Sequence, residues 1–337
     1  MPNQRLGKQT IQFEAPPVLI GNAAVAGKKE GEGPLAQSFD YIGIDSYWGE
    51  QSWEKAESVM QKKVFALAAD KASIAPSSVS FLFAGDLLNQ SISSSFASRE
   101  SEIPFFGIFG ACSAMGEGLT LAAMTVAGGF APYAAAVTSS HFCTAERQFR
   151  FPLEYGGQRT PSSQWTVTGA GATILSATGI GPAVTHVTPG KIVDLGIKDP
   201  NNMGAAMAPA AYDTLRQHFE DTGRGPDDYD LIVTGDLGAV GHAVVSDFFQ
   251  KDGVTMRNYQ DCGLMIYDRE QQKVEAGASG CGCAASVFNG YILNAMRAGR
   301  WNKVLFCPTG ALMSTTSAQQ GESIPGICHA VAISTVG

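Results

Sequence analysis

The chain contains an internal duplication, and this feature restricts its possible folds more than any other. Residues 76–87 read PSSVSFLFAGDL, and residues 226–237 read PDDYDLIVTGDL. In each copy, a turn that contains proline leads into a short apolar strand that ends at Gly-Asp-Leu. Two similar halves usually stack or pair, and ligands bind preferentially at the seam between such units.

Each copy is followed by a segment that contains cysteine and opens a helix of small residues. The first segment, at 110–114, reads GACSA, and the second, at 281–285, reads CGCAA. When the two copies are laid over each other, Cys112 falls on Cys283. The duplication therefore draws attention to one cysteine position in each half.

Composition excludes several classes of protein. The chain has 337 residues and is 45% hydrophobic, as expected for an ordinary globular protein. Its net charge of −8 and the lack of dense Lys/Arg runs argue against nucleic-acid binding. The polar first ten residues predict no signal peptide, and the uncharged stretch at 119–138 predicts a buried helix and strand rather than a membrane span. Seven cysteines without a paired Cys-x-x-Cys array predict no metal site, and no cofactor is expected.

The order of apolar segments predicts the fold class. The runs at 79–84 and 231–234 lack alternation, which is typical of central strands covered on both faces. An amphipathic helix is predicted over 51–72, ahead of the first of these strands. Helices that alternate with buried strands predict an α/β protein with mostly parallel sheets. With the duplication, this gives an N-terminal half at 1–180 and a C-terminal half at 181–337 that share one core.

Cys112 is the strongest candidate for a functional residue. An apolar strand at 105–109 delivers it to a tight turn at the start of a helix. A thiol there lies at the positive end of the helix dipole, which favours the thiolate. Unpaired backbone N–H groups at Cys112 and Ser113 can also hold a carboxylate or an oxyanion. Alternatively, Cys112 is only a small residue that fits a crowded helix start. The duplication favours the functional interpretation over this structural one.

Three further residues follow predicted strands at the same sheet edge. His141 follows a strand at 134–138, at the carboxyl end where open parallel sheets bind ligands. It lies near Cys112 if the two strands are neighbours, and otherwise it is a structural histidine. Asp86 and Asp236 end equivalent strands, and each can instead cap the segment that follows. For Asp236 we favour the capping role.

Two arginines are the obvious source of positive charge near this edge. Arg147 and Arg150 could clamp a carboxylate with paired hydrogen bonds, and Arg159 is a weaker third candidate. Alternatively, they pair with Glu146 and Glu154 in a solvated loop. Because the protein is acidic overall, an anionic ligand would need such local cations.

These residues resemble those of the thiolase superfamily. Cys112 takes the place of the acyl-accepting cysteine, and residues 168–172, TGAGA, look like the glycine-rich turn of condensing enzymes. More narrowly, nearly the whole chain is similar to the stage V sporulation protein AD family. The stretches that carry this similarity are FAGDLLNQ at 83–90, FGACS at 109–113, TAERQFRF at 144–151, EYGGQ at 154–158, MAPAA at 207–211 and DCGLMIY at 261–267.

The resemblance implies a five-layer αβαβα fold made of two duplicated halves, and a function in binding. That family is understood to bind dipicolinic acid, pyridine-2,6-dicarboxylate, and to take part in its uptake into the developing spore. A part in its release during germination is a second expectation. The resemblance also implies that the protein is made in the forespore and lies at the periphery of the spore inner membrane. Its expected partners there are membrane-embedded subunits of the same complex. Calcium could bridge the ligand, and a homodimer is expected by analogy with thiolases.

The residues themselves weaken an enzymatic interpretation. A condensing enzyme needs an acid/base pair from its second half to activate the thiol and polarise the thioester. Residues 235–238 stand where the first histidine is expected, and no His or Asn lies near 261–263 beyond Asn258. A missing general base costs about a hundredfold to ten-thousandfold in rate.

Three hypotheses follow. The preferred one is a non-catalytic protein that binds dipicolinic acid, with Cys112 as a vestigial nucleophile. The alternative is an acyltransferase or β-ketoacyl synthase-like condensing enzyme that uses Cys112 with His141 or His329. A third is an assembly subunit with an inert pocket. The predicted ligand-binding residues of the preferred hypothesis are Asp86, Cys112, Ser113, His141, Arg147 and Arg150.

Overall fold

The computed structural model describes residues 4–149 and 159–335. Its main sheet has 13 strands and consists of two parts, which we call the first and the second sheet and which follow the same plan. In the first half, β5 pairs in parallel with β6 and β7, and β9 is antiparallel to both β7 and β3. The strands, in order across the sheet, are β6 (Phe105–Gly107), β5 (Phe81–Gly85), β7 (Tyr133–Ser140), β9 (Gly169–Ser176) and β3 (Val18–Ala26).

The second half repeats this order and these directions. There β11 pairs in parallel with β12 and β14, and β17 is antiparallel to both β14 and β10. The two sheets meet where β10 pairs with β3, at Ala183 and Val18. The strands, in order, are β12 (Tyr259–Asp261), β11 (Leu231–Thr234), β14 (Lys303–Cys307), β17 (Ala330–Thr335) and β10 (Pro182–Thr188).

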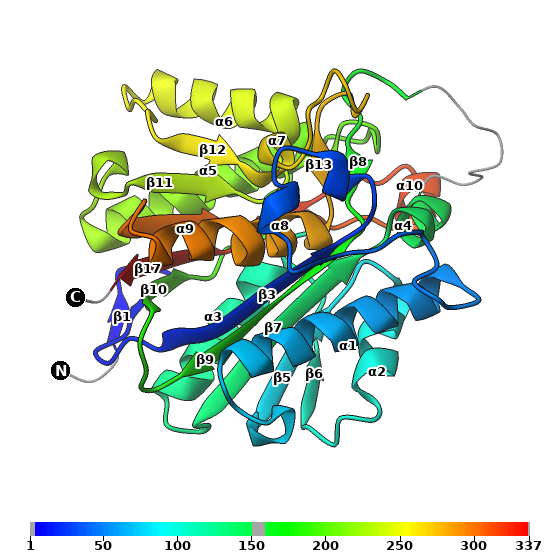
Figure 1. Cartoon of the computed structure of the whole chain (residues 1–337). Coiled ribbons are helices and arrows are strands. Elements are labelled where there is room, and N and C mark those ends of the chain that lie inside the picture. The colour runs from blue at the N-terminus through cyan, green and yellow to red at the C-terminus, as the bar shows by residue number, and fades with distance from the viewer. Residues whose placement is uncertain (1–3, 150–158, 336–337) are drawn as a thin grey trace.

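Helices form three layers around these sheets, which gives five layers in total (Figure 1). One layer covers the outer face of the first sheet, one covers the outer face of the second, and one lies between them. The outer helices of the first half are α1 (Trp53–Lys71) and α2 (Ile92–Ser98), and those of the second are α5 (Met203–Thr222) and α6 (Gly238–Lys251). The middle layer is α3 (Ala114–Ala127), α8 (Cys281–Val287), the π-helical turn Phe288–Ile292 and α9 (Leu293–Arg297).

Shorter elements complete the described part of the chain. Several of them join the two halves or form the edge where the sheets end; β8, for example, pairs with β13. These elements are β1 (Gln4–Leu6), β2 (Thr10–Gln12), β4 (Tyr41–Ile42), α4 (Phe142–Phe149), β8 (Trp165–Thr166), α7 (Cys262–Met265), β13 (Ala278–Ser279), β15 (Thr309–Ala311), α10 (Thr315–Gln319) and β16 (Gly326–Cys328), with 3-10 turns at 30–32, 36–38, 76–78, 89–91 and 226–228.

Small residues allow the middle helices to lie directly on the first sheet. A Cβ atom at Gly171 of β9 would come within 2.3 Å of the backbone oxygen of Ala285 in α8, and one at Gly282 would come within 2.4 Å of the oxygen of Gly169. The glycine-rich segment that we interpreted as a turn therefore lies mostly in strand β9, where its glycines let α8 approach closely.

The predicted elements match the observed ones in type and approximate position. The helix predicted over 51–72 is α1, and the repeated apolar runs are β5 and β11. Position 180, where we placed the boundary between the halves, lies in the connection from β9 to β10. Among the described residues, no helix combines the length and the apolar character that crossing a bilayer requires.

Candidate functional site

A tight turn places Cys112 at the start of α3. The chain leaves β6, and Ala111 adopts a left-handed backbone conformation with a φ of 49°, which costs energy for a residue with a Cβ atom. Ser113 then donates a hydrogen bond of 2.7 Å from its hydroxyl to the backbone oxygen of Gly110. The predicted strand, turn and helix around Cys112 are thus present. The side chain of Ser113 is used inside the turn and is fully buried.

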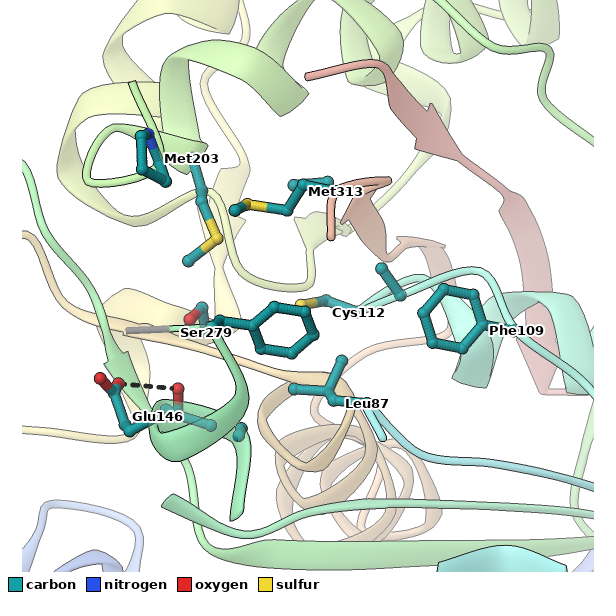
Figure 2. Close-up of a pocket in the computed structure, with 13 residues that line it drawn as sticks. Leu87, Phe109, Cys112, Glu146, Met203, Ser279 and Met313 are labelled. Carbon is teal, nitrogen blue, oxygen red and sulfur yellow. Dashed lines mark hydrogen bonds between the residues drawn. The ribbon is translucent and has the colours of Figure 1, made fainter. Parts of the chain in front are cut away.

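Cys112 lies on the wall of a narrow cavity at the seam between the two halves (Figure 2). The cavity has a volume of about 40 Å³ and mainly apolar walls. Its lining comes from both halves: Leu87, Phe109, Ala111, Cys112, Ala145, Glu146, Phe149 and Thr166 from the first, and Pro200, Met203, Ser279, Ala311 and Met313 from the second. The cavity therefore lies where the two predicted halves meet, which is where the duplication predicts that a ligand binds.

The surroundings of Cys112 keep its thiol protonated. Burial raises the pKa of Cys112 well above its ordinary value, and the nearby carboxylate of Asp236 raises it further. Burial also raises the pKa of Asp236, to about 7, and the hydroxyl of Thr309 donates a hydrogen bond of 2.7 Å to its Oδ1. The expected thiolate at the helix N-terminus is therefore wrong, because burial and a neighbouring acid outweigh the helix dipole.

No histidine lies on the wall of this cavity, and all five histidines of the chain are among the described residues. His141 is buried elsewhere, with its Nε2 2.8 Å from the backbone oxygen of Ser46, and burial lowers its pKa to about 4. His329 accepts a hydrogen bond at Nδ1 from the backbone of Gly190, and His242 stacks on Tyr259.

The strand order explains why His141 misses the site. Its proximity to Cys112 required that the strands preceding the two residues be neighbours. In the structure, β5 lies between β6 and β7, so the sheet separates the ends of those two strands. His141 lines a different hollow with Ser46 and Trp165.

Asp86 is also absent from the cavity wall. Its Oδ1 accepts a hydrogen bond of 2.8 Å from the backbone of Leu88, and its Oδ2 accepts bonds from the backbone and hydroxyl of Ser94 at 2.8 and 2.6 Å. These bonds fix the start of α2. The capping role that we considered for both aspartates therefore holds for Asp86, whereas Asp236 lies beside Cys112.

The predicted arginine clamp is not assembled in the described part of the chain. Arg147 forms an ion pair with Glu54 and lies over the ring of Trp53, on the outer side of α4. Arg150 lies outside the described residues. Arg159 forms an ion pair of 3.0 Å with Glu146, the acidic residue on the cavity wall, and it stacks near Trp165.

Sequence reasoning missed several of the residues that form the site. The duplication could have indicated that Asp236 belongs to the site, because Asp236 follows a strand equivalent to the one that Asp86 follows. The spacing of Ala145 and Phe149 on one face of α4 was also a usable signal. Met203 and Met313 gave no such signal, because Met203 begins α5 and Met313 follows β15, and their positions at the cavity depend on the packing of the second half.

A family model and a curated relative both match nearly the whole chain. The family model described as "Stage V sporulation protein AD (SpoVAD)" matches residues 7–334. The stage V sporulation protein AD of Bacillus subtilis (strain 168) is 46% identical over 332 residues, which is 98% of this chain and 98% of that protein.

Solved structures of condensing enzymes share the fold at low sequence identity. The 3-oxoacyl-[acyl-carrier-protein] synthase III of Aquifex aeolicus is 12% identical, with a TM-score of 0.59, and covers 94% of this chain and 99% of its own. A cerulenin-bound variant of OleA from Xanthomonas campestris is 14% identical, with a TM-score of 0.62, and the match covers 96% and 97% of the two chains. The fold is therefore thiolase-like, as expected, and the chain belongs to the stage V sporulation protein AD family.

Proposed function

We propose that this protein is a non-catalytic binding protein of the sporulation machinery and that dipicolinic acid is its ligand, held in the Cys112 cavity. One observation carries the proposal: a protonated thiol lies beside the carboxyl group of Asp236 where acyl transfer needs a thiolate and a base. Membership of a sporulation family supports the biological setting.

The geometry supports binding over acyl transfer. An activated cysteine has a lowered pKa or an adjacent general base. Here burial and Asp236 both raise the pKa of Cys112, and none of the five histidines lines its cavity. A thiol that keeps its proton is a poor nucleophile, so the cavity is better suited to hold a molecule than to react with it.

The side chains that line the cavity support an aromatic ligand. Leu87 and Phe109 lie on one side, and the thioether side chains of Met203 and Met313 lie on another (Figure 2). Aromatic and thioether groups pack well against the faces of an aromatic ring. A pyridine ring with carboxylates at its edge has the flat, apolar faces that such walls accept.

The charge of the lining favours a neutral form of the ligand. The described lining contains the acidic Glu146, which is already paired with Arg159, and it contains no Lys or Arg. Moving a dianion into such surroundings costs much more than moving a neutral complex. We therefore propose the calcium chelate of dipicolinate as the bound form, with calcium carried as part of the ligand.

The family relationship supports a role in the uptake of this ligand into the developing spore and in its release during germination. In this proposal the protein is made in the forespore and acts at the spore inner membrane, beside membrane-embedded subunits of the same complex.

Calorimetric titration tests the proposal. The purified full chain is titrated with pyridine-2,6-dicarboxylate with and without calcium, and with pyridine-3,5-dicarboxylate, which has the same charge but cannot chelate through its ring nitrogen. Saturable heat is expected for the calcium chelate of the 2,6-isomer. Ala145→Leu, which extends a buried side chain on the cavity wall into the space, should weaken binding about tenfold or more.

Arg216→Ala is the control, because Arg216 pairs with Glu220 on the surface of α5 and lies outside the cavity, and the affinity of this variant should equal that of the wild type. No heat with the wild type, or equal affinity in the wild type and Ala145→Leu, would remove this assignment.

A further inference from the structure

Helix α4 closes the Cys112 cavity. Ala145, Glu146 and Phe149 of this helix line the cavity, and Figure 2 shows Glu146 on its wall. The enclosed volume of about 40 Å³ has room for a few water molecules, whereas sites for small organic ligands usually measure on the order of 300 Å³ or more. Any organic ligand therefore enters only if part of the wall moves.

Individual polar contacts tie α4 to its surroundings, among them the ion pair of Arg147 with Glu54 in α1 and a hydrogen bond of 3.1 Å from the hydroxyl of Thr166 to Glu146. The hydroxyl of Thr144 donates a hydrogen bond of 3.0 Å to Oε2 of Glu57 in α1. Glu146 pairs with Arg159, and the amide of Gln148 donates a bond of 2.9 Å to Asn89. The helix has eight residues and lies outside both sheets, so it can move while the layers beneath keep their packing.

The contact beneath the first turn of α4 belongs to a buried acidic cluster. Glu57 and Asp86 are almost completely buried and close enough that each carboxylate affects the other. Glu57 also accepts a hydrogen bond of 2.8 Å from the hydroxyl of Ser139 in β7.

The groups that face Glu57 are acidic or neutral on every side. Asp86 faces it from the end of β5, Cys281 from α8, Ser139 from β7, Thr144 from α4 and Ser93 from α2. No Lys, Arg or His is among the groups that shift its pKa, and burial and Asp86 raise that pKa to about 8. At neutral pH Glu57 therefore holds a proton.

We propose that α4 is a lid over the Cys112 cavity and that the Glu57–Asp86 pair beneath its first turn is the latch, which holds the lid closed while Glu57 keeps its proton. This inference holds whichever ligand the cavity takes. When the proton leaves, two like charges face each other in a buried place without a cation. Admitting water relieves this repulsion, and α4 is tied to Glu57 through Thr144 and lies outside both sheets.

The alkylation rate of Cys112 reports lid opening. The native full chain is treated with iodoacetamide over a range from pH 7 to pH 9.5, and modification of each cysteine is followed by peptide mass spectrometry. Cys283 and Cys262 are fully buried and report global unfolding, and the half-buried Cys143 reports the intrinsic effect of pH on the reagent.

Glu57→Gln is the matched variant, because a glutamine resembles the protonated acid but cannot lose a proton. We expect Cys112 to react at the same rate in the wild type and in Glu57→Gln at pH 7. Above pH 8 the wild type should react faster, by up to about tenfold for each further pH unit, while Cys283 stays protected.

Thr144→Val gives a second, independent test, since it removes the contact between lid and latch without changing a charge. It should speed the reaction of Cys112 at pH 7 and leave that of Cys283 unchanged. The proposal is overturned if wild type and Glu57→Gln react alike at every pH, or if Cys112 always reacts in step with Cys283. Because no ligand is used, this result is independent of whether dipicolinate binds.

Discussion

Cys112 and Asp236 come from different halves of the chain and form one chemical unit. The thiol follows β6 of the first half, and the carboxyl follows β11 of the second. In a buried place, ionised Asp236 makes ionisation of the neighbouring thiol costly and so raises the pKa of Cys112. Burial raises the pKa of Asp236, whereas its hydrogen bond with Cys112 lowers it. The surroundings of Cys112 therefore keep its thiol protonated.

Asp236→Asn tests this interpretation at the residue scale. An asparagine keeps an oxygen that can accept the bond from Thr309 but removes the neighbouring charge. We expect the pKa of Cys112 to fall toward the ordinary thiol value of about 8.5, although burial still holds it above that value. The pH profile of Cys112 alkylation measures the shift. An unchanged profile would show that Asp236 has no influence on the thiol.

At the scale of elements, the edge strand β6 is where we expect two copies of the chain to associate. In the part of the chain that the structure describes, it pairs with β5 on one side only, and its side chain at Phe106 is 50% exposed. Phe109, just beyond its end, is 48% exposed and also lines the Cys112 cavity. An open strand edge with exposed aromatic residues is a natural place for pairing with a second copy.

We therefore propose that the expected homodimer forms across β6. Phe106→Glu should convert a dimer into a monomer, because it places a charge on the exposed aromatic surface of this edge strand. Phe130→Glu changes an even more exposed phenylalanine at the end of α3 and should leave the dimer intact. Analytical ultracentrifugation distinguishes the two states. A dimer that survives Phe106→Glu would place the interface elsewhere.

At the scale of the whole molecule, buried ionisable groups determine how stability depends on pH. Burial raises the pKa of Glu57, Asp236 and Asp261 to about 8, 7 and 6. The folded state then holds protons that the unfolded chain releases, so stability falls as the pH rises from about 4 through these values.

The histidines act in the opposite direction. Burial lowers the pKa of His141, His186 and His329 to about 4 and that of His218 to about 3. The unfolded chain then binds protons that the folded state does not, so stability falls as the pH drops below about 6.5. We expect the highest melting temperature near pH 6 and lower values at pH 5 and pH 8, measured by calorimetry in buffers of equal ionic strength. A stability that rises steadily from pH 6 to pH 8 would contradict this account.

The sequence predicted the architecture better than the site. The duplication and the apolar runs gave the paired halves, α1, β5, β11 and the turn at Cys112, because these depend on local pattern. The position of His141 depends on the order of the strands in the sheet, and the position of Arg147 depends on the side of α4 that it occupies. Neither can be read from the order of the elements along the chain. Asp236 meets Cys112 only because the two halves pack face to face, a contact that no local pattern specifies.

The central claim is that the Cys112 cavity binds dipicolinate without reacting with it. A crystal structure of the protein grown with saturating calcium dipicolinate tests it most directly. We predict that the pyridine ring lies in the cavity between Leu87 and the side chains of Met203 and Met313, with α4 displaced from its present position. We predict no bond between the ligand and the sulfur of Cys112. An empty cavity with the ligand bound elsewhere, or a covalent adduct on that sulfur, would contradict the account.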